Sequence, residues 1–266
     1  MSTVPDIDVP EVANTEDANK YMAEEKKRTE KTRLQKKIIS SGNSEIDRKM
    51  GGGIPAGSLC LLEGVNDSGK SVLVQQIMWG AMQQNRTVLT FTTENTIQSL
   101  LKQMESLSLD ISDYFIIGNS TIFPIHEKLI ESKGEAAENM LKLMLRSLSS
   151  RKEDIIIIDS LTVFVVNSTE HEILNFFAEC KKLSDEGKTI LITVHSYAFS
   201  EMLMIRIRSI CDTHLHLKIE QVGDQLVKTM EVAKIRGAQK TTGNIISFDV
   251  EPGFGLRIIP VSRAKA

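Results

Sequence analysis

Aromatic residues are scarce in this sequence, and positive charge is not in excess. Phe, Tyr and Trp together make up 5% of the 266 residues, with a single Trp and three Tyr, and the formal net charge is −3. Proteins that bind single strands of nucleic acid combine a basic groove with aromatic side chains on which the bases stack. The net charge also provides no overall basic field. We therefore do not expect nucleic acid as a partner.

Cysteine and long apolar runs are scarce as well. Cys60, Cys180 and Cys211 are widely spaced and form no CxxC pair or metal-ligand run. Such a sparse, odd count is typical of a reducing compartment rather than of a disulfide framework. No run approaches the roughly 20 apolar residues that a membrane span requires, and the first residues form no apolar signal segment. We expect a cytoplasmic protein that reaches a membrane only through partners.

Two parts of the chain differ in composition. Residues 1–19 are polar and acidic, which is typical of a disordered segment, and residues 20–37 are dense in charge. The second stretch fits either a solvated helix with Glu/Lys pairs four residues apart or a floppy charged tail. The composition of a globular domain begins at residue 38. We predict a charged, flexible N-terminal arm at 1–37 and one domain over 38–266.

Strand-like and helix-like patterns alternate along most of this domain. Short apolar runs predict strands at residues 58–63, 87–91, 114–117, 154–158 and 189–194. Helical spacing predicts helices at residues 72–84, 96–107, 127–148, 170–185 and 201–210. The alternation is typical of an α/β fold with a mostly parallel, twisted sheet flanked by helices. Past residue 211, extended segments at 213–220, 225–235 and 245–250 predict antiparallel strands at the C-terminal end of the sheet.

One segment matches a nucleotide-binding motif. Residues 64–71, GVNDSGKS, fit G-x-x-x-x-G-K-[ST], the Walker A phosphate loop, at every fixed position. Average residue usage produces that pattern by chance in a chain of this length on the order of 1% of the time. The motif also lies between a predicted strand and a predicted helix, which is the placement that phosphate binding requires. A glycine turn without a ligand is the weaker interpretation.

The chemistry of this loop follows from its residue types. Backbone N–H groups converge on phosphate oxygens, and the helix N-terminus adds its dipole. We expect Lys70 to reach the β- and γ-phosphates and the Ser71 hydroxyl to ligate Mg²⁺, so the predicted cofactors are ATP and Mg²⁺. The residues predicted to bind the nucleotide are Gly64, Asn66, Asp67, Ser68, Gly69, Lys70, Ser71 and Val72.

A second candidate metal-binding residue is Asp159, which ends the apolar run IIIID. A hydrophobic strand that stops at an aspartate is typical of the Walker B half of a phosphate-loop site. We expect its carboxylate to hold Mg²⁺ through a water molecule. The alternative is an aspartate that only caps the turn after the strand.

Several segments resemble RecA-type ATPase domains of the KaiC branch. Residues 41–62, SGNSEIDRKMGGGIPAGSLCLL, resemble the lead that these domains have before the phosphate loop, and KIRG at 234–237 resembles their late strand motif. The loop NDSGKSVL, the segment TTENT at 92–96 and the charged arm resemble the FlaH (ArlH) family of the archaellum, the archaeal flagellum.

The resemblance implies a RecA-like, KaiC-like nucleotide-binding domain over residues 38–266, with nucleotide at a subunit edge. It also implies a homo-oligomer, commonly a hexameric ring. The implied partners are the motor ATPase FlaI and the scaffold protein FlaX, at the cytoplasmic face of the membrane-bound motor.

In KaiC-like domains, the strand after the phosphate-loop helix ends in paired glutamates, one of which is the general base for the attacking water. The matching pair here is Thr93 and Glu94, so the first carboxylate is absent. Glu94 is the candidate base, since a base must lie within reach of the nucleophile; the alternatives are a sensor or a plain polar strand end. The missing carboxylate predicts slow hydrolysis.

Two basic residues match the late strand motif of the KaiC branch. There, a basic pair reaches the γ-phosphate of a neighbouring subunit, and Lys234 and Arg236 hold the matching positions. Residues two apart on a strand point to one face. The alternative is a solvated basic edge. His195, after the fifth strand, is either a γ-phosphate sensor or a strand-end histidine with satisfied hydrogen bonds.

Three functions remain open at this point. The first is a regulatory and assembly component of the archaellum motor, in which ATP binding controls oligomerisation and contact with the motor ATPase while hydrolysis is slow or absent. The second is an active ATPase with Glu94 as general base. The third is a recombinase-like DNA-binding ATPase. It is disfavoured because residues 160–169 and 196–203, after the fourth and fifth strands, contain no Lys or Arg.

Overall fold

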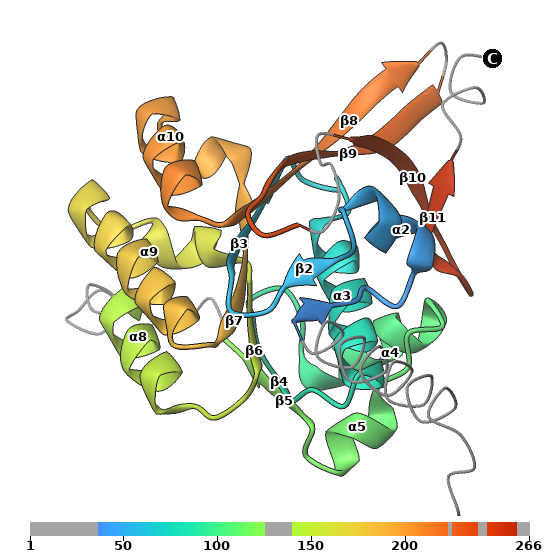
Figure 1. The fold of residues 1–266 in the computed structure, drawn as a ribbon, viewed down its shortest axis with the longest axis horizontal. Helices are drawn as coiled ribbons and strands as arrows, with labels where there is room; N and C mark the ends of the chain where they lie inside the picture. The colour runs from blue at the N-terminus through green and yellow to red at the C-terminus, as the bar shows by residue number, and fades with distance from the viewer. Residues whose placement is uncertain (1–36, 126–139, 223–224, 239–243, 260–266) are drawn as a thin grey trace, which may run out of the picture. The chain divides into compact units, whose positions relative to one another are not determined.

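A large mixed sheet forms the centre of residues 38–266 (Figure 1). The computed structural model describes residues 37–125, 140–222, 225–238 and 244–259, so the arm predicted at 1–37 lies outside the described residues except for Lys37. Within these ranges, nine strands are hydrogen-bonded in the order β11-β10-β9-β8-β3-β7-β6-β4-β5. Their bounds are β3 (Leu59–Gly64), β4 (Val88–Thr92), β5 (Ser120–Pro124), β6 (Ile155–Asp159), β7 (Thr189–His195), β8 (Thr213–Val222), β9 (Gln225–Ile235), β10 (Ile245–Glu251) and β11 (Gly255–Ile259).

Strand direction divides this sheet into two parts. The strands from β5 through β4, β6, β7 and β3 to β8 are all parallel to their neighbours. Strand β9 is antiparallel to β8, and β10 and β11 continue in alternating directions. We call β9, β10 and β11 the antiparallel extension. This topology confirms the predicted α/β fold, with a mostly parallel sheet and antiparallel strands at its C-terminal end.

Helices cover both faces of the sheet (Figure 1). Of the helices in the described ranges, four pack on one face and three on the other, in two separate apolar clusters. On the first face lie α2 (Ser44–Lys49), α3 (Lys70–Gln83), α4 (Ile97–Ser106) and α5 (Ser112–Ile116). On the second lie α8 (Met140–Ser150), α9 (Glu170–Asp185) and α10 (Glu201–Ile210). The short elements are the strand pair β1 (Ile38–Ile39) and β2 (Ile54–Pro55), and the 3-10 helices η1 (Leu161–Val165) and η2 (Ser196–Ala198).

Strand β6 is buried on both sides, which explains its uninterrupted run of isoleucines. Ile155 and Ile157 belong to the cluster that contains α3, whereas Ile156 and Ile158 belong to the cluster that contains α9. Successive side chains of a strand point to opposite faces, so a strand covered by helices on both sides needs apolar residues at every position. Each fully buried side chain of this kind contributes roughly 1.5–3 kcal/mol to folding.

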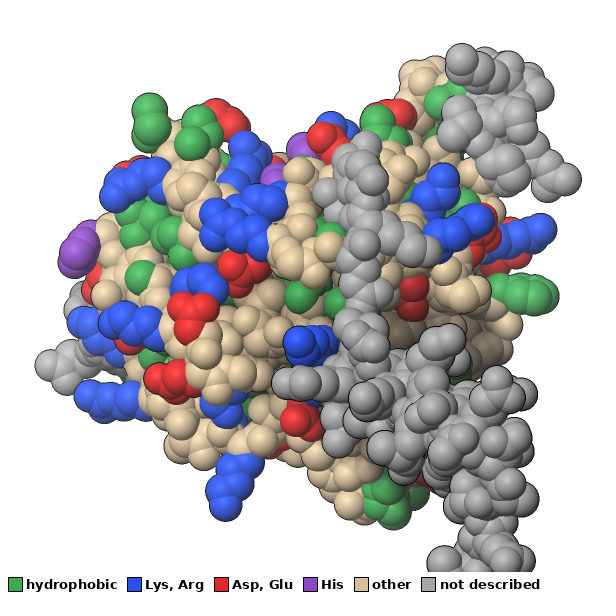
Figure 2. Space-filling model, in the orientation of Figure 1, with side chains coloured by type: hydrophobic (Ala, Val, Ile, Leu, Met, Phe, Trp, Pro, Cys, Tyr) green, Lys and Arg blue, Asp and Glu red, His purple; other side chains and the backbone are tan. Residues whose placement is uncertain are grey.

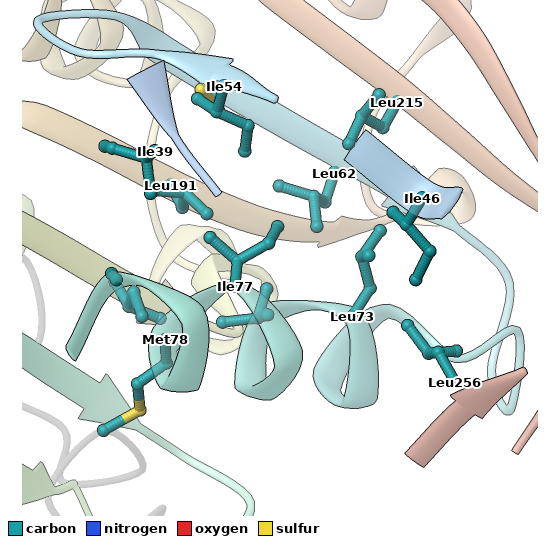
Figure 3. Packing of buried hydrophobic residues seen from close by; sticks show 14 of the residues in the cluster. Ile39, Ile46, Ile54, Leu62, Leu73, Ile77, Met78, Leu191, Leu215 and Leu256 are labelled. Carbon is teal, nitrogen blue, oxygen red and sulfur yellow. The ribbon is translucent and has the colours of Figure 1, made fainter. Parts of the chain in front are cut away.

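The helix after the phosphate loop, α3, is held in place by this core (Figure 3). Leu73 and Ile77 point from the helix toward the sheet, where Leu62 of β3 and Leu191 of β7 lie. All four side chains are buried. Close packing of this kind leaves little room for the helix to shift. The start of α3, and with it the phosphate loop, is therefore fixed at the end of β3.

Some helix bounds agree with their predictions because capping signals mark them. Helix α9 occupies the predicted residues and begins with a capping box, in which Thr169 and Glu172 each accept a hydrogen bond from the other's backbone N–H. Helix α4 begins after Thr96, whose hydroxyl accepts from the Ser99 N–H at 3.1 Å. Local side-chain chemistry thus determines where both helices start.

The strand predicted at 114–117 is wrong, because those residues lie in and just after helix α5. The strand of this region is β5, which pairs with β4 at the edge of the sheet. The Asp110 carboxylate accepts hydrogen bonds from the Ser112 N–H at 2.8 Å and from its hydroxyl at 2.7 Å. These bonds stabilise the turn that starts the helix. A short apolar run by itself fits either a strand or a helix.

Two other elements complete the comparison with the predicted secondary structure. The helix predicted at 127–148 is described only from Met140, as α8, because residues 126–139 lie outside the described ranges. Strand β11 was not predicted. Its Leu256 is buried and points toward the core near α3 (Figure 3), whereas the next residue, Arg257, is exposed. So short a strand gives only a weak alternating signal.

The surface seen in Figure 2 carries both signs of charge. Over α8, α9 and α10, Lys and Arg side chains are interspersed with Asp and Glu, as is usual for the solvated faces of helices. Within the described ranges, none of the helices combines the length and the apolar character needed to cross a bilayer. Cys60, Cys180 and Cys211 are free and buried.

Candidate nucleotide-binding site

The predicted phosphate loop lies at the carboxyl ends of the parallel strands, where open α/β sheets bind their ligands. A cleft of about 490 Å³ opens there. Eight of its lining residues were singled out from the sequence, namely Asn66, Asp67, Gly69, Lys70, Ser71, Val72, Glu94 and His195. Four others were not, namely Gln103, Tyr197, Lys228 and Val250.

The two glycines of the motif are required by the geometry of the loop. Gly69 immediately precedes α3 and has φ of 92°, a conformation that favours glycine. Gly64 leaves β3 so close to β8 that an added Cβ atom would lie 2.5 Å from the Leu217 carbonyl oxygen. Ser68 does not line the cleft; it is buried and donates from its hydroxyl to the Val65 carbonyl at 2.8 Å. Gly64 and Ser68 therefore shape the loop.

Lys70 extends back over the loop from the first turn of α3. Its Nζ donates to the Val65 carbonyl oxygen at 2.7 Å, and the side chain lines the cleft. Burial lowers the pKa of the Lys70 ammonium, while the nearby carboxylates of Glu94, Asp159 and Asp67 oppose that shift. An ammonium among loop N–H groups at a helix N-terminus fits the β- and γ-phosphates of a nucleotide.

The residues predicted to bind Mg²⁺ come together at the Ser71 hydroxyl. Its Oγ lies 3.3 Å from Asp159 Oδ1 and 3.4 Å from Glu94 Oε2. The described residues contain no group of three His, Cys, Asp or Glu that could hold a metal by themselves. Mg²⁺ at phosphate sites takes one or two carboxylates and completes its shell with phosphate oxygens and water. The all-oxygen set of Ser71, Asp159 and Glu94 fits that requirement.

Asp159 is a buried carboxylate without a cation bonded to it among the described residues. Its Oδ1 accepts a hydrogen bond from the Thr193 hydroxyl at 2.6 Å. Burial raises the pKa of Asp159 to about 6; the Thr193 hydrogen bond opposes the rise and the Glu94 charge adds to it. A bound cation would favour the ionised form. Thr193 was not singled out from the sequence, since a threonine inside an apolar strand has no distinctive pattern.

Thr93 occupies the position where the family pattern has a carboxylate. Its N–H donates to the Asp159 carbonyl oxygen at 2.9 Å. Its hydroxyl accepts from the Ser160 N–H at 3.2 Å. Thr93 therefore links the end of β4 to the end of β6 on both sides of the Asp159–Ser160 bond, and it provides no base.

His195 and Tyr197 form the other wall of the cleft beyond β7. Their rings are stacked, with centroids 5.2 Å apart and planes inclined by 16°. The Tyr197 hydroxyl donates to Asn66 of the phosphate loop at 3.1 Å, and His195 Nδ1 lies 3.1 Å from the Thr162 hydroxyl. Burial lowers the pKa of His195, and the Lys70 charge adds to that effect. His195 therefore lines the cleft and also has a hydrogen-bond partner, so both predicted roles stay open.

Lys234 and Arg236 are not among the residues that line the cleft of their own subunit. Lys234 donates to the Arg208 carbonyl oxygen at 2.9 Å, and Arg236 lies 3.7 Å from Asp212 with 59% of its side chain exposed. At about 3.3 Å per residue, Lys234 is roughly 20 Å along β9 from Lys228, which does line the cleft. A contact with a neighbouring subunit's γ-phosphate stays a prediction.

A buried cluster next to the loop escaped the sequence predictions. Glu63, the residue before Gly64, is 1% exposed. Its carboxylate accepts two hydrogen bonds from Arg208, at 2.7 and 2.9 Å, and lies 2.9 Å from His214 Nε2. Burial alone would raise the pKa of Glu63, but the hydrogen bonds from His214 and Arg208 outweigh it and lower the value to about 2. The only signal in the sequence was a glutamate inside an apolar strand.

Comparison with known proteins adds the following relatives. The family model described as ATPase: KaiC matches residues 39–263. The archaeal flagellar ATP-binding protein FlaH of Sulfolobus acidocaldarius is 34% identical over 229 residues, which are 86% of this chain and 100% of that protein. The same-named protein of Methanocaldococcus jannaschii is 27% identical over 221 residues, 83% of this chain and 94% of that one.

Solved structures agree with this assignment of the fold. The crystal structure of the flagellar accessory protein FlaH from Methanocaldococcus jannaschii matches with a TM-score of 0.74 at 26% identity, over 84% of this chain and 99% of that chain. A KaiC-like protein from Pyrococcus horikoshii matches with a TM-score of 0.67 at 20% identity, over 84% and 99% of the two chains. The second likeness concerns the fold alone.

Proposed function

This chain belongs to the FlaH family of KaiC-like ATPase domains, and from that premise we propose that it is an ATP-binding regulatory component of the archaeal flagellar motor. ATP and Mg²⁺ bind in the cleft at the phosphate loop. The bound nucleotide controls assembly of the chain with itself and with the motor ATPase, and its hydrolysis is slow or absent.

The convergence of three side chains at the start of α3 is the observation that supports nucleotide binding. Lys70 and Ser71 lie at the first turn of the helix, and Asp159 lies 3.3 Å from the Ser71 hydroxyl although it comes from β6. In this proposal Ser71 and Asp159 hold Mg²⁺, and Lys70 holds the β- and γ-phosphates. The metal, when bound, neutralises charge on the β- and γ-phosphate oxygens.

Slow hydrolysis is proposed because only one of the two carboxylates of the KaiC-like general-base pair is present. Thr93 replaces one carboxylate and is already hydrogen-bonded on both sides of the Asp159–Ser160 bond. Glu94 has its carboxylate 3.4 Å from Ser71 Oγ, on the side of the metal ligands. That position suits a residue that ligates or senses the metal. The same position favours a second candidate function, an active ATPase with Glu94 as general base, because Glu94 borders the cleft in which the attacking water must lie.

We propose that the part of the subunit surface that carries Lys234 and Arg236 controls assembly. These cations do not line their own cleft, and we propose that they exchange their contacts with the Arg208 carbonyl and Asp212 for the nucleotide of a neighbouring copy in a hexameric ring. A cation supplied in this way responds both to the γ-phosphate and to the presence of the neighbour. FlaI and FlaX are the proposed partners, at the cytoplasmic face of the membrane.

One set of samples tests the proposal. Purified protein is titrated with Mg-ATP, phosphate release is followed, and mass is measured by light scattering with and without nucleotide. We expect binding, a larger assembly with ATP, and far less than one turnover per second. Lys70→Ala removes the phosphate-binding ammonium and should abolish binding, whereas Lys102→Ala, at an exposed position of α4, should bind like the unaltered protein.

Each part of the proposal can fail separately. Absence of ATP binding would contradict the assignment of the site. Several turnovers per second that Glu94→Gln abolishes would establish the active ATPase instead. An unchanged mass with and without ATP would contradict control of assembly.

A further inference from the structure

A second lysine lies beside the phosphate loop and comes from a distant part of the chain. Lys228 lines the same cleft as Lys70, but it belongs to β9 of the antiparallel extension. It pairs in register with Phe248 of β10. A Cβ atom added to Gly69 would lie 3.0 Å from the Phe248 ring and 4.0 Å from Lys228 Cδ. The stem of Lys228 therefore runs along the loop at Gly69.

The ammonium of Lys228 has no carboxylate partner within 4.0 Å among the residues that the structure describes, although the side chain is half-buried. Two other partly buried lysines differ in this respect. Lys218 of β8 lies 2.8 Å from Glu231, and Lys181 of α9 lies 3.1 Å from Asp212. A cation at the wall of a cleft, with its stem packed and its charge unmatched, suits an anionic ligand.

The order of the strands places Lys228 on the side of the loop opposite to Glu94 and Asp159. Strand β3, which leads into the loop, has β7, β6 and β4 on one side and β8, β9 and β10 on the other. Glu94, Asp159 and His195 come from the first side. They are the residues predicted to contact the γ-phosphate or the metal ion. Lys228 comes from the second side, next to the Gly69 end of the loop, where the backbone N–H groups cradle the α- and β-phosphates.

From this placement we infer that Lys228 is a second phosphate-binding cation, which contacts the α- and β-phosphates and makes the antiparallel extension part of the nucleotide site. The inference rests on the proposed binding of ATP. Because ATP and ADP share these phosphates, Lys228 strengthens the binding of both nucleotides alike. Discrimination between ATP and ADP is left to the residues on the other side of the loop.

The test measures the affinity of ATP, ADP and inorganic tripolyphosphate, each with Mg²⁺, by calorimetry. The variant Lys228→Met keeps the apolar stem against Phe248 and removes the charge, and Lys228→Arg keeps the charge. Hydrogen bonds to charged groups contribute enough that we expect Lys228→Met to weaken all three ligands roughly ten- to hundredfold. Lys228→Arg should stay within about threefold of the unaltered protein, a rescue that a packing role would not produce.

Lys102→Ala is the matched control, because it removes a cation next to the cleft-lining Gln103 without touching the cleft. Far-ultraviolet circular dichroism of each variant without nucleotide checks the fold. Affinities of Lys228→Met within twofold of the unaltered protein would overturn the inference while leaving ATP binding intact. A loss for ATP alone, or for ATP and ADP but not tripolyphosphate, would overturn the assignment to the α- and β-phosphates. Unaltered protein that binds no nucleotide would overturn the proposed function and this inference together.

Discussion

Two buried carboxylates lie near the carboxyl ends of strands in the parallel part of the sheet, and their surroundings shift their pKa values in opposite directions. Glu63 lies at the end of β3 and Asp159 at the end of β6, and their exposed fractions are 1% and 6%. The pKa of Glu63 is lowered from 4.5 to about 2, whereas that of Asp159 is raised from 3.8 to about 6. Burial acts on both in the same direction, so the difference must come from the partners.

The partners distinguish a carboxylate that is ion-paired within the fold from one that receives only hydroxyl hydrogen bonds. Glu63 is bonded to the Arg208 guanidinium and lies beside His214, so its charge is neutralised within the fold. Asp159 receives hydroxyl hydrogen bonds from Thr193 and Ser71 but no bonded cation among the described residues. A buried charge without a counterion is unfavourable, and it is typical of functional sites. Of the two, Asp159 is the carboxylate whose charge the described residues leave for a bound cation to balance.

The largest expected effect is that of Glu63→Gln on stability. The variant leaves Arg208 and His214 without their buried counterion, and breaking a buried pair from one side is strongly destabilising. We expect a loss of about 3 kcal/mol in the free energy of unfolding at pH 7, measured by urea denaturation, since Arg208 is partly exposed and keeps Glu201.

The pH dependence of that loss follows from the lowered pKa. Glu63 contributes its stability above pH 4.5, and the contribution disappears as the pH falls toward 2. The difference between the variant and the unaltered protein should shrink over this window. A loss that is absent at pH 7, or that is the same at pH 3, would show that the two carboxylates are not as different as their surroundings indicate.

The expected effect of Asp159→Asn on the free energy of unfolding, without nucleotide or Mg²⁺, is intermediate in size and opposite in sign. A raised pKa means that folding disfavours the ionised form, so the unaltered protein loses stability as the pH rises from 3.8 through about 6. The amide avoids that loss of about 3 kcal/mol. It also weakens the hydrogen bonds from the Thr193 and Ser71 hydroxyls, so the variant should be more stable by about 2 kcal/mol at pH 8. At pH 4 the two proteins should be nearly equal.

Thermal unfolding at both pH values measures this gain. The same variant should bind Mg-ATP more weakly, because it lacks the carboxylate that we propose holds Mg²⁺. If Asp159→Asn were less stable than the unaltered protein at pH 8, the charge of Asp159 would have to be compensated by the fold, as that of Glu63 is.

The smallest effect is expected for Glu201→Gln, a change at the exposed partner of the same arginine. Glu201 lies 2.9 Å from Arg208, as close as the buried contacts, but 75% of its side chain is exposed. Solvent screens such pairs, so we expect a change within about 0.5 kcal/mol. Urea denaturation beside Glu63→Gln makes a matched comparison. Equal losses for the two variants would mean that burial does not decide the strength of the Arg208 contacts.

Much of the fold was predictable because its signals are local. Helical spacing predicted α9 at residues 170–185, where the structure has it, and the isoleucines of β6 indicated a strand covered on both faces. The segment 114–117 was assigned wrongly because the Asp110 turn decides its helical conformation, and a short apolar run does not distinguish a helix from a strand.

The site was predictable where its residues belong to a local sequence pattern. The loop at 64–71 matches a motif, and Asp159 ends an apolar strand. Thr193, Tyr197 and Lys228 line or support the site from segments far along the chain, and no spacing connects them to the loop. Pairing of strands in the sheet brings them together.

By itself, the sequence determined that this chain has a phosphate loop, an α/β domain and a terminal aspartate on a buried strand. These features depend on which residues are neighbours along the chain. The charge state of Glu63 and Asp159, the bonded position of Thr93 and the approach of Lys228 to Gly69 were decided only by the tertiary structure. Those properties depend on burial and on partners, and both arise when strands distant in sequence become neighbours in the sheet.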